Sequence, residues 1–158
     1  MMQTQAEIFE YAGFWVRVAA TLIDTLLIML ITLPLLWSIY GADYFESTAI
    51  LNGPADFIIS WLMPAVGVIV FWMVKQATPG KMALSLRVLD ADTGNSLSAG
   101  QSVGRYLAYF VSMLPLFIGI IWVAFDKKKQ GWHDKLAGTV VVRAKNRAPE
   151  KVQFPSAL

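Results

Sequence analysis

The sequence predicts an all-α transmembrane bundle with two full spans, a third helical segment that either re-enters or crosses, and a small cytoplasmic β element. Three observations lead to this fold class. Apolar residues make up 56% of the 158 residues. They gather in three long stretches, which a soluble domain would expose as large patches but which lipid can cover. Finally, Lys and Arg are absent between residues 18 and 74.

The first two apolar stretches, about residues 16–40 and 57–74, are each long enough to cross a bilayer. A helix needs about 20 mostly apolar residues to span the hydrocarbon core. Trp15, Trp37 and Trp72 stand near the ends of these stretches, as interfacial anchors do. We therefore expect two spanning helices here.

The distribution of charge predicts the orientation of these helices. The loop at 41–56 has three acidic residues and no basic one, whereas Lys75, Lys81 and Arg87 follow the second stretch. Cytoplasmic loops are enriched in Lys and Arg, so the loop at 41–56 is expected outside and the N-terminal segment 1–14 inside. Residues 1–13 lack the basic start of a secretory signal. These features indicate a multi-pass protein of the inner (plasma) membrane.

The third apolar stretch, within residues 99–126, predicts a re-entrant helical hairpin. A single crossing would place the basic tail 144–158 outside, although basic segments favour the cytoplasm. Pro115 breaks a helix in the middle of the stretch, and Gly119 permits a tight bend. Broken backbone at this depth must be shielded by protein, here by the first two helices. One kinked crossing is the alternative.

Two short segments predict the β element. Apolar residues partly alternate over residues 82–89, and the TVVVR sequence at 139–143 is rich in β-branched residues. Short strands need partners, and these two can pair only on one side of the membrane. The chain thus divides into a domain at 15–143 and a basic tail at 144–158 that we expect to be a flexible cytoplasmic segment.

A polar stripe on the first helix is the leading candidate site. Arg17, Thr21, Asp24 and Thr25 share one face at the helical period. An aspartate inside a span costs about 3 kcal/mol on insertion scales and needs a partner, for which Arg17 or Arg105 is the candidate, with Thr21 as a hydrogen-bond donor. The stripe is either an ion or proton site or pocket wall, or a buried pair that only fixes helix packing.

The segment after the third stretch carries the remaining candidates. His133 beside Asp134 would act as a sensor if it titrated near neutral pH, or else as a hydrogen-bonded corner before the following strand. Lys127, Lys128 and Lys129 are expected to bind anionic headgroups, at about 1 kcal/mol per charge. One histidine and no cysteine predict no metal site, and no cofactor motif is present.

Two broad classes of function are disfavoured. The basic residues are juxtamembrane, so nucleic acid is not an expected partner. A nucleophile and its base cannot be assembled from one histidine and no cysteine, so we do not expect an enzyme.

Several motifs in combination resemble the RDD family of membrane proteins, which is named for an arginine and two aspartates. The matching features are Arg17, Asp24, TPGK at 78–81, LRVLDADTG at 86–94, Asp126, and QGWHDKLAGTVVV at 130–142. The resemblance implies that Arg17, Asp24 and Asp126 are the residues of the name, with Asp134 close behind the last. It also implies a multi-pass, mostly bacterial protein, and a role in transport of unidentified ligands has been suggested for the family. Some relatives look like cation/proton antiporters, and an RDD region occurs in a eukaryotic membrane scaffold of protein degradation.

Two functional hypotheses follow. The first is a component of transport of an unidentified ligand or cation, which requires a homo-oligomer because two spans and a hairpin can hardly enclose a pathway. The second is a non-catalytic accessory or scaffold subunit that binds another membrane protein, for example through the edge of the β element.

Overall fold

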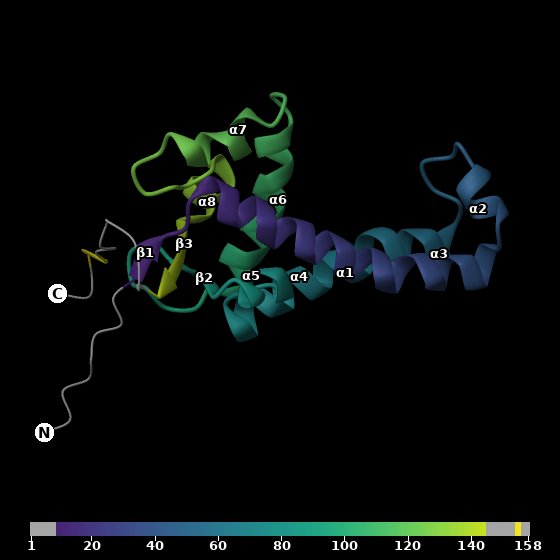
Figure 1. Cartoon of the computed structure of the whole chain (residues 1–158), viewed down its shortest axis with the longest axis horizontal. Coiled ribbons are helices and arrows are strands. Elements are labelled where there is room, and N and C mark those ends of the chain that lie inside the picture. Colours follow the sequence, from purple (N-terminus) through teal and green to yellow (C-terminus); the bar gives the residue numbers. More distant parts are fainter. Residues whose placement is uncertain (1–8, 145–153, 156–158) are drawn as a thin grey trace, which may run out of the picture.

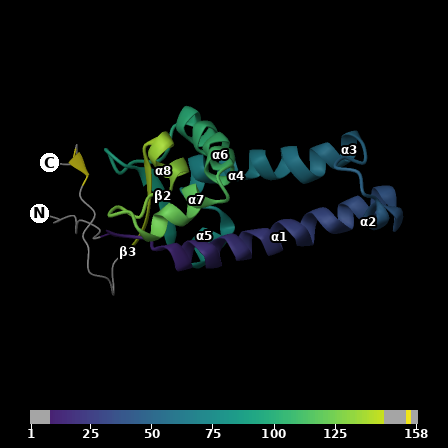
Figure 2. The ribbon, with the colours of Figure 1, turned by 90° about the horizontal axis from the view of Figure 1, so that it is seen from above.

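Two long helices dominate the computed structural model, which describes residues 9–144 and 154–155. Helix α1 (Phe14–Tyr40) runs outward, and the chain returns through α3 (Pro54–Phe57), η1 (Ile58–Leu62) and α4 (Met63–Lys75) as one continuous rod. The short helix α2 (Asp43–Glu46) belongs to the connection that joins the two rods, at the end of the molecule far from the chain termini (Figures 1 and 2). Both rods are long and apolar enough to cross a membrane.

The second rod contains a local irregularity that its sequence explains. The segment η1 is one turn of π-helix, and it is followed at once by Pro64. Proline has no backbone N–H to donate to the preceding turn, and its ring crowds that turn. A single widened turn relieves the crowding without ending the helix, as π-bulges do elsewhere.

The third apolar stretch is bent. Helix α6 (Ala99–Met113) is followed by α7 (Ile118–Ile121) and the 3-10 turn η2 (Trp122–Ala124), and the two parts meet at 113°. The predicted capping box at its start is confirmed, because the Ser98 side chain accepts from the Gln101 N–H and the Gln101 side chain accepts from the Ser98 N–H. Counting this bent pair as one span gives up to three candidate spans.

The prediction that Gly119 makes the bend is wrong. The left-handed residues at the corner are Leu116 and Phe117, with φ of 51° and 62°. Gly119 instead allows the two arms of the bent segment to approach each other, since an added Cβ would lie 2.7 Å from the Ser112 Cα and 2.9 Å from the Trp132 ring. Such a distance is well inside van der Waals contact, so a side chain would force the arms apart.

A three-stranded antiparallel sheet joins segments that are far apart in the sequence. Its order is β1 (Phe9–Tyr11), β3 (Thr139–Ala144), β2 (Leu86–Asp90). The consecutive Val140, Val141 and Val142 are all buried, because β3 is the central strand and is covered on both faces. The sheet lies at one end of the molecule, away from α2 (Figure 1).

Two details of the predicted β element are corrected. The strand expected at 82–89 begins only at Leu86, because residues before it form α5 (Pro79–Ala83), which Pro79 starts at a favourable first position. Strand β1 was not expected within the N-terminal segment 1–14, since three residues carry too little periodicity to be recognised. Most of the predicted tail 144–158 lies outside the described residues.

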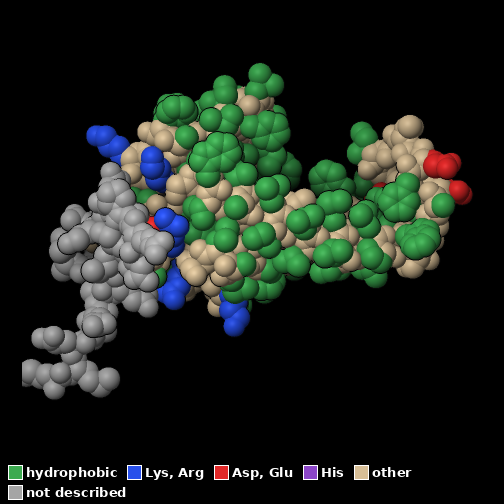
Figure 3. Space-filling model, in the orientation of Figure 1, with side chains coloured by type: hydrophobic (Ala, Val, Ile, Leu, Met, Phe, Trp, Pro, Cys, Tyr) green, Lys and Arg blue, Asp and Glu red, His purple; other side chains and the backbone are tan. Residues whose placement is uncertain are grey.

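The hydrophobic core sits at the sheet end. Its central cluster brings together side chains from the link between β1 and α1, from α1, α4 and the sheet, and from the loop before α6: Ala12, Ala20, Trp72, Leu86, Val88, Leu97 and Val141. The outer parts of both rods bury little within the chain, and Leu30 of α1, for example, is 72% exposed. Apolar side chains cover the visible face along α1, whereas Lys and Arg gather at the sheet end and Asp and Glu at the opposite end (Figure 3).

Candidate functional site

A buried carboxylate, Asp134, joins three elements near the sheet. It stands in the first turn of α8 (Trp132–Ala137). The Arg17 Nη1 at the start of α1 lies 2.6 Å from its Oδ2, and the Arg105 guanidinium of α6 contacts its Oδ1. Oδ2 also accepts from the Gly131 N–H at 3.0 Å, which caps α8. We call Arg17, Arg105 and Asp134 the ionic cluster.

The two arginines of the ionic cluster have further partners. Arg17 donates from Nε to the Ala12 carbonyl at 3.0 Å and from Nη2 to the Lys129 carbonyl. Arg105 is fully buried, donates to the Thr139 hydroxyl, and lies over the Trp72 ring with its Cζ 5.0 Å from the centroid. The cluster therefore joins α1 to Ala12, the residue after β1, and α6 to Thr139, the first residue of β3. This favours a role in holding these elements together.

His133 is part of this packed layer. Its ring stacks on Tyr109 with centroids 3.9 Å apart, and its Nδ1 lies 3.4 Å from the Ser112 hydroxyl. Burial lowers the pKa of His133 to about 3, in spite of the neighbouring Asp134 carboxylate, and the charges of the nearby arginines act in the same direction. The imidazole is thus neutral at physiological pH, which favours the ordered corner over the sensor.

The pKa of Asp134 moves the other way from what burial alone would do. Burial raises the pKa of a carboxyl group, but the guanidinium groups of Arg105 and Arg17 outweigh it and hold the pKa of Asp134 well below its usual range. Asp134 is therefore ionised wherever the fold persists, and it balances one of the two buried arginines.

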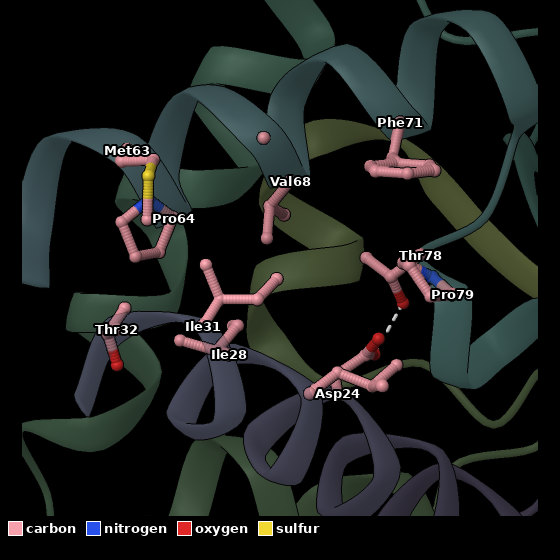
Figure 4. A pocket seen from close by; sticks show the side chains of 12 residues that line it. Asp24, Ile28, Ile31, Thr32, Met63, Pro64, Val68, Phe71, Thr78 and Pro79 are labelled. Atoms are coloured by element: carbon pink, nitrogen blue, oxygen red, sulfur yellow. Dashed lines mark hydrogen bonds between the residues drawn. The ribbon is translucent and has the colours of Figure 1, made fainter. Parts of the chain in front are cut away.

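Asp24 has a different partner from the one expected. Neither arginine of the ionic cluster pairs with it. Its carboxylate accepts from the Thr78 hydroxyl at 2.5 Å and from the Gly80 N–H at 2.7 Å, and so it caps the start of α5 (Figure 4). Gly80 lies directly on α1, since an added Cβ would be 2.1 Å from the Ala20 carbonyl oxygen. The TPGK motif is thus the segment that docks on the Asp24 face of α1.

A cavity of about 330 Å³ lies beside this contact, between α1, α4, α5 and α6; its wall surface is mostly apolar, with a minority of polar atoms. We call it the Lys81 cavity. Its polar lining residues are Thr21, Asp24, Thr25, Thr78, Lys81, Tyr106 and Tyr109. A second hollow of about 230 Å³, toward α7 and His133, shares Thr21, Lys81, Tyr109 and Met113 with it. Lys81 therefore stands between two cavities.

Lys81 is the functional candidate that sequence reasoning missed. Its side chain is only 6% exposed. Burial lowers the pKa of Lys81; the Arg105 and Arg17 charges add to this effect, while Tyr109 and Asp24 oppose it. In the sequence analysis Lys81 contributed only to the predicted orientation, because a lysine that follows an apolar stretch is normally solvated. Its place in TPGK was the available signal.

Asp126 and the side chains of the three lysines after it lie outside the ionic cluster, which Lys129 contacts only through its backbone carbonyl. Asp126 pairs with Lys135 at 2.5 Å and accepts from the N–H groups of Lys128 and Gln130, and its pKa is lowered because these interactions outweigh its partial burial. Lys127 and Lys128 are exposed, whereas the Lys129 ammonium donates to the Ala124 carbonyl. Within the part of the chain that the structure describes, no three His, Cys, Asp or Glu side chains group as metal ligands.

Comparison with known proteins places these features in a family. A sequence model described as the RDD family matches residues 11–138. The chain is 30% identical to the uncharacterized protein YxaI of Bacillus subtilis, over 83% of this chain and 96% of the relative. It is 28% identical to an uncharacterized protein of Rickettsia prowazekii, over 85% and 96%. It is 30% identical to the uncharacterized membrane protein YteJ of Bacillus subtilis, over 85% and 82%.

No solved structure matches the chain. The family match spans both long rods, the bent segment and the whole ionic cluster, from Arg17 to Asp134. The chain belongs to the RDD family.

Proposed function

We propose that this chain is a multi-pass inner-membrane protein that works, as an oligomer, in the transport of an unidentified ligand or cation. In this proposal α1 and the Pro54–Lys75 rod are the two full spans, and the sheet and both termini are cytoplasmic. The apolar surface of the rods and the basic residues at the sheet end support this orientation. The YteJ relative, named as a membrane protein, supports the membrane assignment.

The bent segment α6–α7 is a re-entrant hairpin in this arrangement. Strand β2 precedes it and β3 follows it, yet the two pair along their length in one sheet, from Leu86 opposite Arg143 to Asp90 opposite Thr139. A segment that crossed once between them would separate the strands by the thickness of the bilayer. The 113° bend supports the same reading, because it returns the chain toward the side it came from.

The observation that carries the transport proposal is the Lys81 cavity. It holds an acid and a base, Asp24 and Lys81, among hydroxyl groups at the inner end of the proposed spans. Ionisable residues at such positions are costly and commonly mark ligand or ion pathways. One chain has too few spans to enclose a pathway, so the cavity would be completed by neighbouring copies.

Flux measured in proteoliposomes tests this proposal. The protein is purified in mild detergent, its mass is determined, and it is reconstituted for cation and proton flux. Asp24→Asn removes the charge of Asp24, and we expect it to abolish flux. Thr78→Val is the matched control, since it removes the 2.5 Å hydrogen bond to Asp24 but keeps the carboxylate. Unchanged flux in Asp24→Asn would contradict the transport role.

A non-catalytic scaffold is the second candidate, and the exposure of the rods favours it. Several large side chains of α1 and α4 face away from the molecule, among them Leu22, Leu30 and Val74 at 60% or more. Helices of another membrane protein would cover this surface as well as lipid does. A second protein that co-purifies in fixed stoichiometry would support this candidate, and a clean homo-oligomer would count against it.

A further inference from the structure

We infer that the Lys81 cavity binds an anionic phospholipid, with the headgroup at Lys81 and an acyl chain in the apolar groove between α1 and α4. The inference rests on the proposed function in that it uses the same cavity, and it names the class of molecule that enters it. Three independent features of the site carry it, namely an unmatched buried cation, an excess of positive charge, and an apolar groove that opens from the cavity.

The first feature is the state of the Lys81 ammonium group. Lys81 as a whole residue is only 6% exposed, and among the described residues no hydrogen bond or ion pair of its ammonium group is found, although this group is not fully sealed from solvent. An ammonium group taken out of water is unfavourable unless a partner replaces its hydration. The lowered pKa of Lys81 reflects this burial. An anion in the cavity would supply the missing partner.

The second feature is the charge around the cavity. Three buried cations, Lys81, Arg17 and Arg105, face only two carboxylates, Asp24 and Asp134. Asp134 is held between the two arginines, and Asp24 is engaged by Thr78 and Gly80 of α5. His133 adds no charge, because its pKa is far below neutrality. One positive charge is left over, so the cavity favours an anion over a zwitterion.

The polar lining also suits a phosphate group. Four hydroxyl-bearing residues, Thr21, Thr25, Tyr106 and Tyr109, line the cavity together with Lys81. Hydroxyl groups donate readily to phosphate oxygens, and hydrogen bonds to a charged acceptor are the stronger kind. These groups come from two different helices, so they would hold the headgroup from both sides.

The third feature is the groove, which makes the ligand amphiphilic. The apolar groove has about 230 Å³ of free volume and shares Asp24, Ile28, Pro64, Val68 and Thr78 with the Lys81 cavity. Figure 4 shows Ile28, Ile31 and Val68 facing the space between the two helices, with Asp24 at one end. An acyl chain matches such walls, whereas a free phosphate ion would leave them unfilled.

The test measures phospholipid binding to the full chain in detergent, by native mass spectrometry and by titration. We expect phosphatidylglycerol to bind at least about tenfold more tightly than phosphatidylcholine or phosphatidylethanolamine. Lys81→Met should weaken the binding of phosphatidylglycerol at least about tenfold, as loss of a charge-assisted contact does. Lys75→Met, which removes an exposed lysine at the end of α4, is the control and should change it less than about twofold.

A second pair of variants tests the groove. Added Cβ atoms at Gly67, in the groove, and at Gly104, outside it, would both meet nothing within 4 Å. Gly67→Leu should fill the groove and weaken phosphatidylglycerol binding about tenfold, while Gly104→Leu leaves it unchanged. This pair decides the question if Lys81→Met fails to fold. Competition by inorganic phosphate is expected to be weak, and equally tight binding of phosphate would overturn the lipid assignment.

Two further outcomes would overturn the inference, namely equal affinity for anionic and zwitterionic lipids, or unchanged binding in both Lys81→Met and Gly67→Leu. Transport is judged separately. Lys81-dependent lipid binding combined with normal flux in Asp24→Asn would refute the transport role alone. Loss of flux in Asp24→Asn without any lipid selectivity would refute the lipid site alone.

Discussion

At the scale of single residues, the molecule depends on balance among its buried charges. Asp134 is ionised and fully buried, and it neutralises part of the charge on Arg17 and Arg105. A buried ion pair is weak evidence for net stability, because its desolvation offsets much of its attraction. Removal of one partner is another matter, since it leaves the remaining charges buried without compensation.

Asp134→Asn should therefore destabilise the protein strongly. We expect a loss of about 3–5 kcal/mol in the free energy of unfolding, because the two guanidinium groups lose the carboxylate that they share. Asp126→Asn is the matched control: its pair with the half-exposed Lys135 should contribute less than about 1 kcal/mol. Denaturant unfolding in mixed micelles measures both. Similar losses in the free energy of unfolding of the two variants would show that the ionic cluster is no more important for stability than an exposed ion pair.

His133 predicts how stability responds to acid. Its pKa in the folded chain, about 3, lies below the ordinary value of 6.5, so the unfolded chain binds a proton first as pH falls. Stability is fully present above pH 6.5 and is lost progressively toward pH 3. Between pH 6.5 and 5.5 the expected loss is about 1 kcal/mol. His133→Gln should abolish this dependence, and an unchanged pH profile in that variant would assign the effect to other groups.

The residues of the site could be predicted from the sequence only in part. An aspartate in an apolar helix is costly unless it has partners, and for this reason the sequence indicated Asp24 as a candidate. The partners of Asp24 were not predicted. One of them is the backbone N–H of Gly80, 56 positions away, and every residue except proline has such a group, so the sequence does not single it out. Arg17 or Arg105 was expected to pair with Asp24, but both pair with Asp134 instead, and that choice depends on how α8 packs.

At the scale of elements, α5 holds the first helix against the rest of the domain. Its N-terminus is capped by Asp24, and Gly80 brings its backbone against that of α1 at Ala20. The contact leaves no room for a side chain. The position of α5 in turn fixes Lys81, which follows Gly80 and points into the cavity.

Gly80→Ala should break this contact. The added methyl group would overlap the Ala20 carbonyl oxygen, so α5 must shift, at an expected cost of about 1–3 kcal/mol. Gly104→Ala is the control in α6, where an added Cβ meets nothing, and it should be neutral or slightly stabilising. Thermal unfolding in detergent compares the two. Equal unfolding temperatures would mean that α1 and α5 can move apart to accept the methyl group with little loss of stability.

Elements were predictable where one physical property decides them. Hydropathy alone identified the apolar stretches that form α1, α4 and the bent segment, because apolar runs of about the length that could cross lipid stand out from the rest of the chain. Short elements were less accessible. The boundary at Leu86 depends on the docking of α5, and β1 exists because β3 offers it an edge, so neither follows from local sequence.

At the scale of the whole molecule, the sheet constrains the path of the chain. It contains a strand from before the first rod, one from after the second, and one from after the bent segment. All three must lie on the same side of any membrane that the rods cross. Two full spans satisfy this condition only if the bent segment returns. The basic sheet end and acidic far end fit the same polarity (Figure 3).

Single-cysteine labelling tests this path directly, because the chain contains no cysteine of its own. Exposed positions Asp43, Asn95 and Ala144 are each replaced by Cys and treated with an impermeant thiol reagent in whole cells and after permeabilisation. With a re-entrant hairpin, position 43 is labelled in whole cells, whereas 95 and 144 react only after permeabilisation. With a kinked crossing, 43 and 144 both react in whole cells, and 95 still does not. The labelling of position 144 therefore separates the two arrangements, with 95 as the internal control. Labelling of position 144 in intact cells would also require β2 and β3 to separate, so it would contradict the sheet as well as the hairpin.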